Sequence, residues 1–393
     1  MNLRASQTVT DRRKALEKEV GVDLKNISSF TLNEEAASSR NCENMIGAAQ
    51  IPMGVAGPLK ISLGARDKSG QPKEFYIPLA TTEGALVASV NRGCKAIAES
   101  GGAAVDSHRV GATRGPVFKV NNLAESRKLY EFLDVHFNAL AAAAERTSHH
   151  LTLTNVSSRG VGRYRYVRFV YDTHDAMGLN MVTIATDAAA RLIEKETGAQ
   201  CIALSGNFCV DKKPSWQNFI NNRGMKVWAE VTLPASVLRD VLNSTAREVH
   251  EVWIAKCMIG SAMSGSMGCN AQYANVIAAM FLATGQDPAH VSECSVGITT
   301  CEVMNEHDLY VSVYLPDLMV GTVGGGTSLA TQKEALSLLG VAGGTPAGEK
   351  GKNSQRFAEI VGAAVLAGEI SLLASLEEGT LARAHARLGR GKD

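Results

Sequence analysis

The spacing of apolar and polar residues predicts a compact module in the middle of the chain. The two kinds of residue alternate along Leu151–Val156 and Tyr164–Tyr171 as they do in strands, and a glycine-bearing turn at 160–162 joins the two segments. Shorter strands are predicted at Pro116–Val120 and Gln200–Leu204, and an Ala-rich helix at Ala124–Arg146.

A second helix of this module is predicted to open at Asp175 and to end at Gly198. Apolar residues recur in it every three or four positions, which favours one buried face. That face would consist of Met177, Met181, Ile184, Ala188 and Leu192. The order strand, helix, strand, strand, helix, strand is the ferredoxin-like arrangement.

The chain on either side of the module has longer and more mixed elements. Helices are predicted at 8–20, Glu83–Ser100, Pro234–Asn243, Asn270–Thr284 and Gln355–Leu376, and strands at Met225–Leu233 and Leu309–Leu315. Met45–Leu63 is extended and glycine-rich, and Thr380–Lys392 is expected to form a short basic helix or tail. We therefore expect an α+β fold with a helical segment at 1–45, a large domain at 46–115 and 206–393, and a small inserted domain at 116–205.

Composition and charge narrow the class of protein. Lys plus Arg number 40 and Asp plus Glu 39, and this balance argues against a general nucleic-acid or anionic-membrane binder. Residues 1–13 lack the apolar core of a secretory signal, and no apolar run reaches the roughly 18 residues of a membrane-spanning helix. The eight cysteines form no CxxC pair, which disfavours a zinc site and favours free thiols in a reducing cytoplasm.

Several polar residues stand in otherwise apolar surroundings. Glu83 lies at the predicted start of an apolar helix, where the helix dipole favours a carboxylate whether or not it has a function. In the same helix, Asn91, Arg92 and Lys95 are either a solvated edge or a phosphate clamp.

Loops carry further candidates. The loop after the strand at 200–204 is polar, as many loops are, and holds Asp211, Lys212 and Lys213. Asp287 follows an apolar helix. A polar residue at this position is also expected if it marks the end of the helix and has no function. Gly321–Gly326 lets the backbone approach a ligand or another backbone closely, but it lacks the GxGxxG spacing of a dinucleotide fold. His385 stands among arginines in the basic tail, where most histidines are surface residues.

Together these motifs resemble one known family, the 3-hydroxy-3-methylglutaryl-coenzyme A (HMG-CoA) reductases. The match runs from residue 41 to 390, in the family's order. The similar segments are Glu43–Gly47, Pro52–Pro58, Ala80–Gly84, Asn91–Lys95, Thr113–Pro116, Asp175–Gly178, Asp211–Pro214, Gly285–Asp287 and Gly321–Gly326. The Asp-Lys-Lys-Pro loop resembles that of class I members. Because no membrane anchor precedes the matched segment, the resemblance implies the soluble archaeal or bacterial form.

The resemblance implies an oxidoreductase that converts (S)-HMG-CoA to (R)-mevalonate and CoA with two NADPH, a four-electron thioester reduction of the mevalonate (isoprenoid) pathway. It also implies four catalytic residues. Lys212 would polarise the thioester carbonyl, and His385 would protonate the departing CoA thiolate. Glu83 would donate a proton to the mevaldehyde oxygen, and Asp287 would lie between Lys212 and Glu83 and tune both.

Matching to the family implies binding residues as well. Those expected around the HMG group are Arg114, Ser205, Asp211, Lys213, Lys256 and Asn275. Those expected to face the CoA phosphates are Asn91, Arg92 and Lys95. Those expected to bind NADP(H), mostly in the small domain, are Ser148, His149, Asp175, Met177, Gly178 and Asn180, with Gly324 and Gly325 close by. The free N–H groups of a helix that opens at Asp175 would suit a phosphate.

One departure from the family pattern concerns the coenzyme. Animal members have a Ser-Arg pair that meets the 2′-phosphate of NADPH, whereas this chain has Ser148 and His149. A histidine binds phosphate only when protonated, so NADH is an alternative coenzyme; no metal is implied.

The resemblance further implies a cytoplasmic homotetramer, built as a dimer of dimers with active sites between subunits. Two other interpretations are a reductase of a different CoA thioester and a non-enzymatic CoA-binding or assembly protein on the same fold. The second is disfavoured because all four chemical positions are filled.

Overall fold

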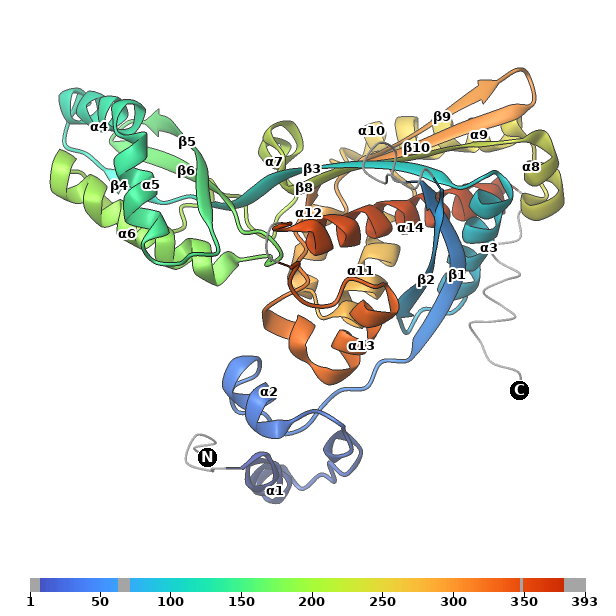
Figure 1. Ribbon diagram of the computed structural model, residues 1–393, viewed down its shortest axis with the longest axis horizontal. Helices are drawn as coiled ribbons and strands as arrows, with labels where there is room; N and C mark the ends of the chain where they lie inside the picture. Colours follow the sequence, from blue (N-terminus) through green and yellow to red (C-terminus); the bar gives the residue numbers. More distant parts are fainter. Residues whose placement is uncertain (1–7, 63–70, 347–348, 378–393) are drawn as a thin grey trace.

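The computed structural model describes residues 8–62, 71–346 and 349–377. They form an elongated molecule in which a small sheet with its helices stands at one end of a longer sheet (Figure 1). The predicted basic tail at Thr380–Lys392, which includes His385, lies outside the described residues.

Four antiparallel strands form the small sheet, in the spatial order β7, β4, β6, β5. They are β4 (Val117–Lys119), β5 (Thr152–Val161), β6 (Tyr164–Asp172) and β7 (Gln200–Ala203). The connecting helices are α4 (Leu123–Val135), α5 (Phe137–Glu145) and α6 (Leu179–Thr197). This order confirms the predicted ferredoxin-like arrangement.

The helices of this module depart from the prediction at two boundaries. A single helix at Ala124–Arg146 is wrong, because His136 leaves helical geometry and separates α4 from α5. A helix that opens at Asp175 is also wrong, since α6 begins at Leu179. Its start is set by Gly178, whose backbone is left-handed with φ of 86°.

The predicted apolar face of α6 is only partly correct, because Met177, Met181 and Leu192 pack half-buried against the core. The buried residues include Val182, Ala185, Ala189 and Ile193, whereas the side chain of Ile184 is 61% exposed. The helix carries apolar residues on two adjacent faces, so periodicity alone selects neither of them. Its packing against α4, α5 and β3 (Ala103–Arg114) decides which face is covered.

The longer sheet has the spatial order β2, β1, β3, β8, β10, β9. Its other strands are β1 (Met53–Ser62), β2 (Lys73–Ala80), β8 (Arg223–Leu233), β9 (Ile298–Met304) and β10 (Asp308–Leu318). Among the strands that the structure describes, β1 and β3 are the one pair that runs parallel. The last residues of β3 also pair with β6, which joins the two sheets. Strands β8 and β10 agree with the prediction, whereas β2, β3 and β9 go beyond it.

Helix α14 (Lys352–Glu377) is the central helix of the larger part and agrees with the prediction at Gln355–Leu376. Every side chain from Phe357 to Ser371 is buried, because α14 contacts β3, β8, β10 and several helices. By length and apolar composition it could cross a membrane, but 94% of its most apolar stretch is buried within the fold. A helix that is apolar all round is typical of a protein core.

Two helices near the site begin later than predicted. Helix α3 (Leu86–Glu99) begins at Leu86 and not at Glu83, so Glu83 lies in the turn before it. Helix α11 (Tyr273–Thr284) begins at Tyr273 and ends, as predicted, at Gly285.

The remaining helices surround this core. Helix α1 (Val9–Val20) has the expected caps, Thr8 and Gly21. The others are α2 (Glu34–Arg40), α7 (Trp216–Asn221), α8 (Ala235–Leu242), α9 (Ala246–Trp253), a π-helix (Ile254–Gly260), α10 (Ser261–Ser264), α12 (Val291–Cys294) and α13 (Ala330–Leu338). Single 3₁₀ turns occur at Asn26–Ser28, Pro288–His290 and Gly325–Ser328.

Candidate active site

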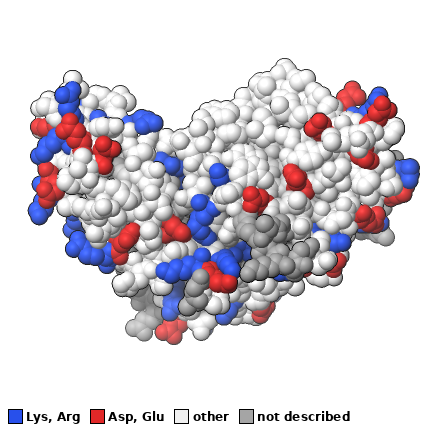
Figure 2. Space-filling view, turned by 45° about the horizontal axis from the view of Figure 1, so that its top comes forward, with Lys and Arg blue, Asp and Glu red and all other residues white. Residues whose placement is uncertain are grey.

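Lys212 and Asp287 meet in one pocket. Lys212 Nζ lies 2.6 Å from Asp287 Oδ2, and the pocket has a volume of about 830 Å³. It brings together nine of the predicted site residues: Arg114, Met177, Gly178, Asn180, Asp211, Lys212, Asp287, Gly324 and Gly325. On one face of the molecule Lys and Arg side chains gather near the middle, with Asp and Glu among them (Figure 2).

The loop that carries Lys212 has a strained backbone. Asn207, Val210 and Lys212 have positive φ angles of 61°, 48° and 58°. A left-handed conformation is unfavourable for a β-branched residue such as Val210, so neighbouring groups must hold it. Hydrogen bonds to the loop carbonyls come from Thr113 (to Cys209, 3.0 Å), Gln217 (to Phe208, 2.7 Å) and Asn218 (to Val210, 2.9 Å). The loop is therefore fixed in a shape that presents Lys212 to Asp287.

A buried charged network lies beneath this pair. Arg223 is fully buried. It donates to both carboxylate oxygens of Glu293 at 2.7 Å and to Asp211 Oδ1 at 2.9 Å. Glu293 also accepts a hydrogen bond from the backbone N–H of Lys212 at 3.2 Å. Buried charges persist only when paired, so these contacts fix the loop from below. The sequence prediction missed Arg223 and Glu293, which stand among polar residues and carry no local signal of their burial.

His290 stands in the same network and is also fully buried. Its Nδ1 hydrogen-bonds Glu293 Oε1. Its Nε2 has no hydrogen-bond partner and lies 3.9 Å from both Asp211 Oδ1 and Asp287 Oδ2. Ligand atoms of Asp211, His290 and Glu293 lie within 4.8 Å of one another, close enough to hold a metal ion. Arg223 already neutralises both carboxylates, so a divalent cation would face a buried guanidinium, and the cluster fits a polar network better.

Burial and the contacts within this network shift the pKa values of its carboxyl groups. Burial opposes the ionisation of Asp287, but hydrogen bonds from Lys212 and the Ala289 N–H hold its pKa below the usual value. Burial also opposes the ionisation of Glu293, yet His290 and Arg223 lower its pKa. Burial, together with Glu293, raises the pKa of Asp317 well above its usual value. Their surroundings therefore favour the charged form of Asp287 and Glu293 and the neutral form of Asp317.

Two backbone segments form another wall of the pocket. Segments 175–180 and 321–326 lie side by side, joined by a parallel bridge between Ala176 and Val323. The Asp175 carboxylate accepts hydrogen bonds from the N–H groups of Thr345 (2.8 Å) and Ser354 (3.0 Å). Burial works against its ionisation, but these hydrogen bonds lower the pKa of Asp175 below its usual value. Asp175 thus fixes the chain before α6 and does not open the helix.

Glycine is required where this wall approaches the Lys212–Asp287 pair. A Cβ atom on Gly326 would lie 2.6 Å from the carbonyl oxygen of Gly285, and one on Gly285 would lie 2.3 Å from that of Gly326. The two backbones therefore pack directly against each other just before Asp287. Gly324 and Gly325 have positive φ and open space around them, so bare backbone faces the pocket there.

Helix α6 begins at the same pocket. Gly178 caps it without a side-chain hydrogen bond, and Leu179, Asn180 and Met181 line the pocket. The N–H groups of a first helical turn lack intrahelical partners and carry partial positive charge. This end of α6 can therefore receive an anion such as a phosphate.

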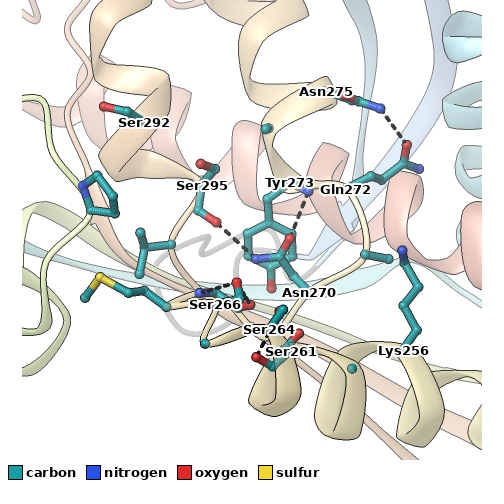
Figure 3. A pocket seen from close by; sticks show the side chains of 18 residues that line it. Lys256, Ser261, Ser264, Ser266, Asn270, Gln272, Tyr273, Asn275, Ser292 and Ser295 are labelled. Atoms are coloured by element: carbon teal, nitrogen blue, oxygen red, sulfur yellow. Dashed lines mark hydrogen bonds between the residues drawn. The ribbon is translucent and has the colours of Figure 1, made fainter.

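Lys256 and Asn275 line a second pocket of about 900 Å³ (Figure 3). Lys256 projects from the π-helix toward the side of the pocket where Gln272 and Asn275 lie. Asn275 Nδ2 donates to Gln272 Oε1 at 3.4 Å and to Glu83 Oε1 at 3.5 Å. Glu83, Lys256 and Asn275 therefore form a second group of predicted residues.

Glu369 fixes the start of α11 beside this second group. It is fully buried in α14. It accepts hydrogen bonds from the N–H groups of Ala271 (2.8 Å) and Gln272 (2.6 Å) and from Thr299 Oγ1 (2.6 Å). Burial raises the pKa of Glu369 above its usual value, although these hydrogen bonds and the charge of Lys256 oppose the rise. The sequence prediction missed this residue, for which a lone carboxylate in an apolar helix was the signal.

Helix α11 separates the two groups of predicted residues. Asn275 lies in its first turn, and Asp287 follows its C-terminal cap, Gly285. A rise of 1.5 Å per residue places these two ends roughly 15 Å apart. Among the described residues of one chain, Asp287 pairs with Lys212, and no hydrogen bond or ion pair joins it to Glu83.

The expected CoA-phosphate residues have partners within the fold. Asn91 Oδ1 accepts a hydrogen bond from the Gly57 N–H at 3.0 Å. Arg92 donates to the backbone carbonyl of Ser371 at 2.6 Å and thereby ties α3 to α14. Lys95 lies 3.7 Å from Glu99, and its side chain is 61% exposed. Of the three, Lys95 is the residue held least by the fold.

The other predicted binding residues lie in or near the first pocket. Arg114 donates to Thr183 Oγ1 at 2.6 Å, and its Nε is buried without a partner. Ser205 Oγ lies 3.5 Å from Cys209 Sγ, and Lys213 Nζ donates to the backbone carbonyl of Asp211 at 3.0 Å. Ser148 Oγ contacts Met181 Sδ at 3.2 Å, and His149 is exposed.

Comparison with known proteins gives a consistent result along the whole chain. The model of the hydroxymethylglutaryl-coenzyme A reductase family matches residues 8–390. The chain is 50% identical over 386 residues to the 3-hydroxy-3-methylglutaryl-coenzyme A reductase of Methanothermobacter thermautotrophicus, covering 98% of this chain and 94% of that protein. It is 49% identical to the reductase of Pyrococcus abyssi, covering 96% and 92%.

Solved structures share the fold at much lower identity. The class II 3-hydroxy-3-methylglutaryl-CoA reductase of Streptococcus pneumoniae bound to NADPH has a TM-score of 0.70 and 18% identity. The alignment covers 95% of this chain and 98% of that structure.

Proposed function

This chain belongs to the hydroxymethylglutaryl-coenzyme A reductase family, and we propose that it reduces (S)-HMG-CoA to (R)-mevalonate and CoA with two NADPH. The observation that carries this proposal is the Lys212–Asp287 contact of 2.6 Å in a pocket that also contains the start of α6, which has no side-chain cap. One pocket thus offers a fixed cation for a developing oxyanion and an anion-binding helix end for a dinucleotide.

Lys212 supplies the positive charge at the thioester carbonyl. When hydride adds to that carbon, the oxygen becomes an oxyanion, and a preorganised ammonium group beside it stabilises the charge. Asp287 orients Lys212 by direct contact. Arg114, Ser205, Asp211 and Lys213 hold the HMG end, with Arg114 and Lys213 neutralising its carboxylate.

The first pocket fits a nicotinamide dinucleotide. The free N–H groups at the start of α6 and the bare backbone at Gly324 and Gly325 suit a pyrophosphate, and Met177 and Asn180 line the same space. Ser148 and His149 are the residues for the 2′-phosphate, with NADH as the weaker alternative. NADPH, when bound, supplies the hydride; no metal is needed, because Lys212 provides the electrophilic charge.

Two further side chains donate protons during the reaction. Glu83 donates to the mevaldehyde oxygen in the second reduction, next to Lys256 and Asn275. His385 protonates the CoA thiolate as it leaves after the first reduction. Lys95, with Asn91 and Arg92 beside it, faces the phosphates of CoA.

The active enzyme is a homo-oligomer with sites between subunits, a dimer of dimers. Glu83 and Lys256 lie at one end of α11 and Lys212 and Asp287 at the other. Contributions from two copies would bring both groups to the same reacting carbon. Large apolar side chains are exposed on the strands and helices near the second pocket, which favours an interface there. They include Met53, Val55, Tyr76, Met258, Ile259 and Met263.

The finer assignments follow from the same matches. The Asp211–Pro214 loop supports a class I enzyme of the archaeal or bacterial type, in line with the relatives from Methanothermobacter and Pyrococcus. Residues 116–205 form the NADP(H)-binding domain, and 46–115 with 206–393 form the HMG-CoA-binding domain, preceded by the helical segment 1–45. The eight free thiols favour the cytoplasm.

Loss of NADPH absorbance on addition of HMG-CoA tests the reductase proposal directly. We expect two NADPH oxidised per mevalonate formed. A chain that binds HMG-CoA without oxidising NADPH would support the binding-protein alternative. A chain that reduces another CoA thioester much faster would support the shifted-substrate alternative.

A further inference from the structure

The hydrogen bonds of the fully buried His290 account for only one of its two ring nitrogens. Its Nδ1 is engaged by Glu293, but its Nε2 is shielded from water and has no hydrogen-bond partner. An unsatisfied buried polar atom is destabilising, and its persistence in a fold calls for an explanation.

The unsatisfied nitrogen lies between two carboxylates of the site. Nε2 is 3.9 Å from Asp211 Oδ1 and 3.9 Å from Asp287 Oδ2. Asp211 is already bound by Arg223 at 2.9 Å, whereas Asp287 is about one-third exposed and faces the pocket. Asp287 is held by Lys212 at 2.6 Å and by the Ala289 N–H at 3.0 Å and not by a buried guanidinium, so it is the carboxylate that can shift toward Nε2. The other charged groups around the ring are Glu293, Arg223 and Lys212.

A small movement would complete the contact. A distance of 3.9 Å exceeds a hydrogen bond by about 1 Å, and catalytic hydrogen bonds are often long before substrate binds. Nδ1 already meets Glu293, and a hydrogen on Nε2 would let that nitrogen donate to the Asp287 carboxylate. Asp287 Oδ1 is meanwhile held by the Ala289 N–H at 3.0 Å, so a bond from Nε2 fixes the orientation of the other oxygen, which meets Lys212.

We propose that His290 is a positioning residue of the reductase site: Glu293 anchors its Nδ1, and its Nε2 holds the Asp287 carboxylate in the orientation that meets Lys212. This inference rests on the function proposed above and adds a residue that acts through Asp287. It assigns the Asp211–His290–Glu293 cluster to orientation of the catalytic pair and not to a metal ion.

Two substitutions separate the roles of the two ring nitrogens. His290→Asn keeps a polar group near the position of Nδ1 and removes the one at Nε2, whereas His290→Gln keeps a polar group near Nε2. His136→Asn is a matched control, because His136 lies at the junction of α4 and α5, outside the site, where asparagine is a good helix cap.

The kinetic test compares these variants with HMG-CoA and NADPH. We expect His290→Asn to lower kcat about 10- to 100-fold, the usual effect of a misplaced catalytic group, with little change in KM. His290→Gln should restore most of kcat, and His136→Asn should match the wild type. If His290→Asn keeps kcat and His290→Gln loses it, the Glu293 contact alone matters and the proposal is wrong.

A crystal structure of each variant gives a readout that does not depend on turnover. We expect the contact between Lys212 and Asp287 to be lost in His290→Asn and kept in His290→Gln. An unchanged contact in both variants would overturn the positioning role even if the wild type reduces HMG-CoA. Conversely, an inactive wild type with the expected displacement would overturn the reductase function and keep the positioning role. One equivalent of bound divalent metal that is lost in His290→Asn would also contradict the proposal.

Discussion

Lys212 and Asp287 come from two loops far apart in the sequence, yet Lys212 Nζ lies 2.6 Å from Asp287 Oδ2. One buried residue connects both loops. Glu293 accepts from the backbone N–H of Lys212 and hydrogen-bonds His290, whose ring lies beside Asp287. The pair is therefore part of a fixed network, and its chemistry can be tested one residue at a time.

Removal of the Lys212 ammonium should abolish both reductive steps. Each step develops an oxyanion, and loss of one preorganised donor commonly costs about 10²- to 10³-fold in kcat. Lys212→Ala should therefore lose activity with HMG-CoA and with mevaldehyde. The control is Lys226→Ala, since Lys226 lies over Trp228 outside the pocket. Retention of mevaldehyde reduction by Lys212→Ala would restrict Lys212 to the first step.

His385, which lies outside the described residues, should matter for only one of the two substrates. A thiolate leaves from HMG-CoA but not from mevaldehyde, so His385→Ala should slow the first substrate and spare the second. Steady-state assays with both substrates measure this split. Equal loss on both substrates, in a variant that unfolds like the wild type, would contradict the leaving-group role.

Two inactive variants should restore each other if active sites lie between subunits. Glu83→Gln and Lys212→Ala remove residues from opposite ends of α11. When the two proteins are unfolded, mixed and refolded, random pairing should recover about a quarter of wild-type activity. Each variant refolded alone is the control and should stay inactive. No recovery, in a mixture that assembles normally, would place both residues in one subunit's site.

A methyl group on Gly326 should disturb the wall of the first pocket. Its Cβ would lie 2.6 Å from the Gly285 carbonyl oxygen, and backbone cannot yield as a side chain can. Gly326→Ala should lower the free energy of unfolding by about 1–3 kcal/mol and weaken NADPH binding. Gly344→Ala is the control, because its Cβ would meet nothing closer than 3.7 Å. Chemical unfolding and coenzyme titration measure the two effects, and equal stability of both variants would contradict the close packing.

Asp317 should be replaceable by a neutral residue near neutral pH. Burial raises its pKa in the folded state, so its contribution to stability is present below the unfolded pKa and is lost as pH rises. Asp317→Asn should therefore be as stable as the wild type, or more so, at about pH 7, and any gain should vanish toward about pH 4. Asp240→Asn, in an exposed pair with Arg239, is the control. Urea unfolding at both pH values tests this, and an equal loss at both would mean that Asp317 is ionised in the fold.

Local patterns in the sequence predict most of the secondary structure and identify the family. Alternation along 151–156 and 164–171 predicts two strands of the small sheet, and the Thr8 and Gly21 caps define α1, because these signals depend only on nearby residues. The motifs around Lys212, Asp287 and Gly321–Gly326 identify the family, since each needs particular residue types at fixed spacing.

The tertiary structure alone decided which residues meet. It selected the buried face of α6, because both of its apolar faces satisfy the same periodicity. It placed Arg223, His290 and Glu293 beneath Lys212 and Asp287 and Glu369 at the start of α11, since burial and pairing of charge depend on elements distant in the chain. It also placed Glu83 and Asp287 at opposite ends of α11. This separation cannot be calculated from the positions of the two residues in the sequence.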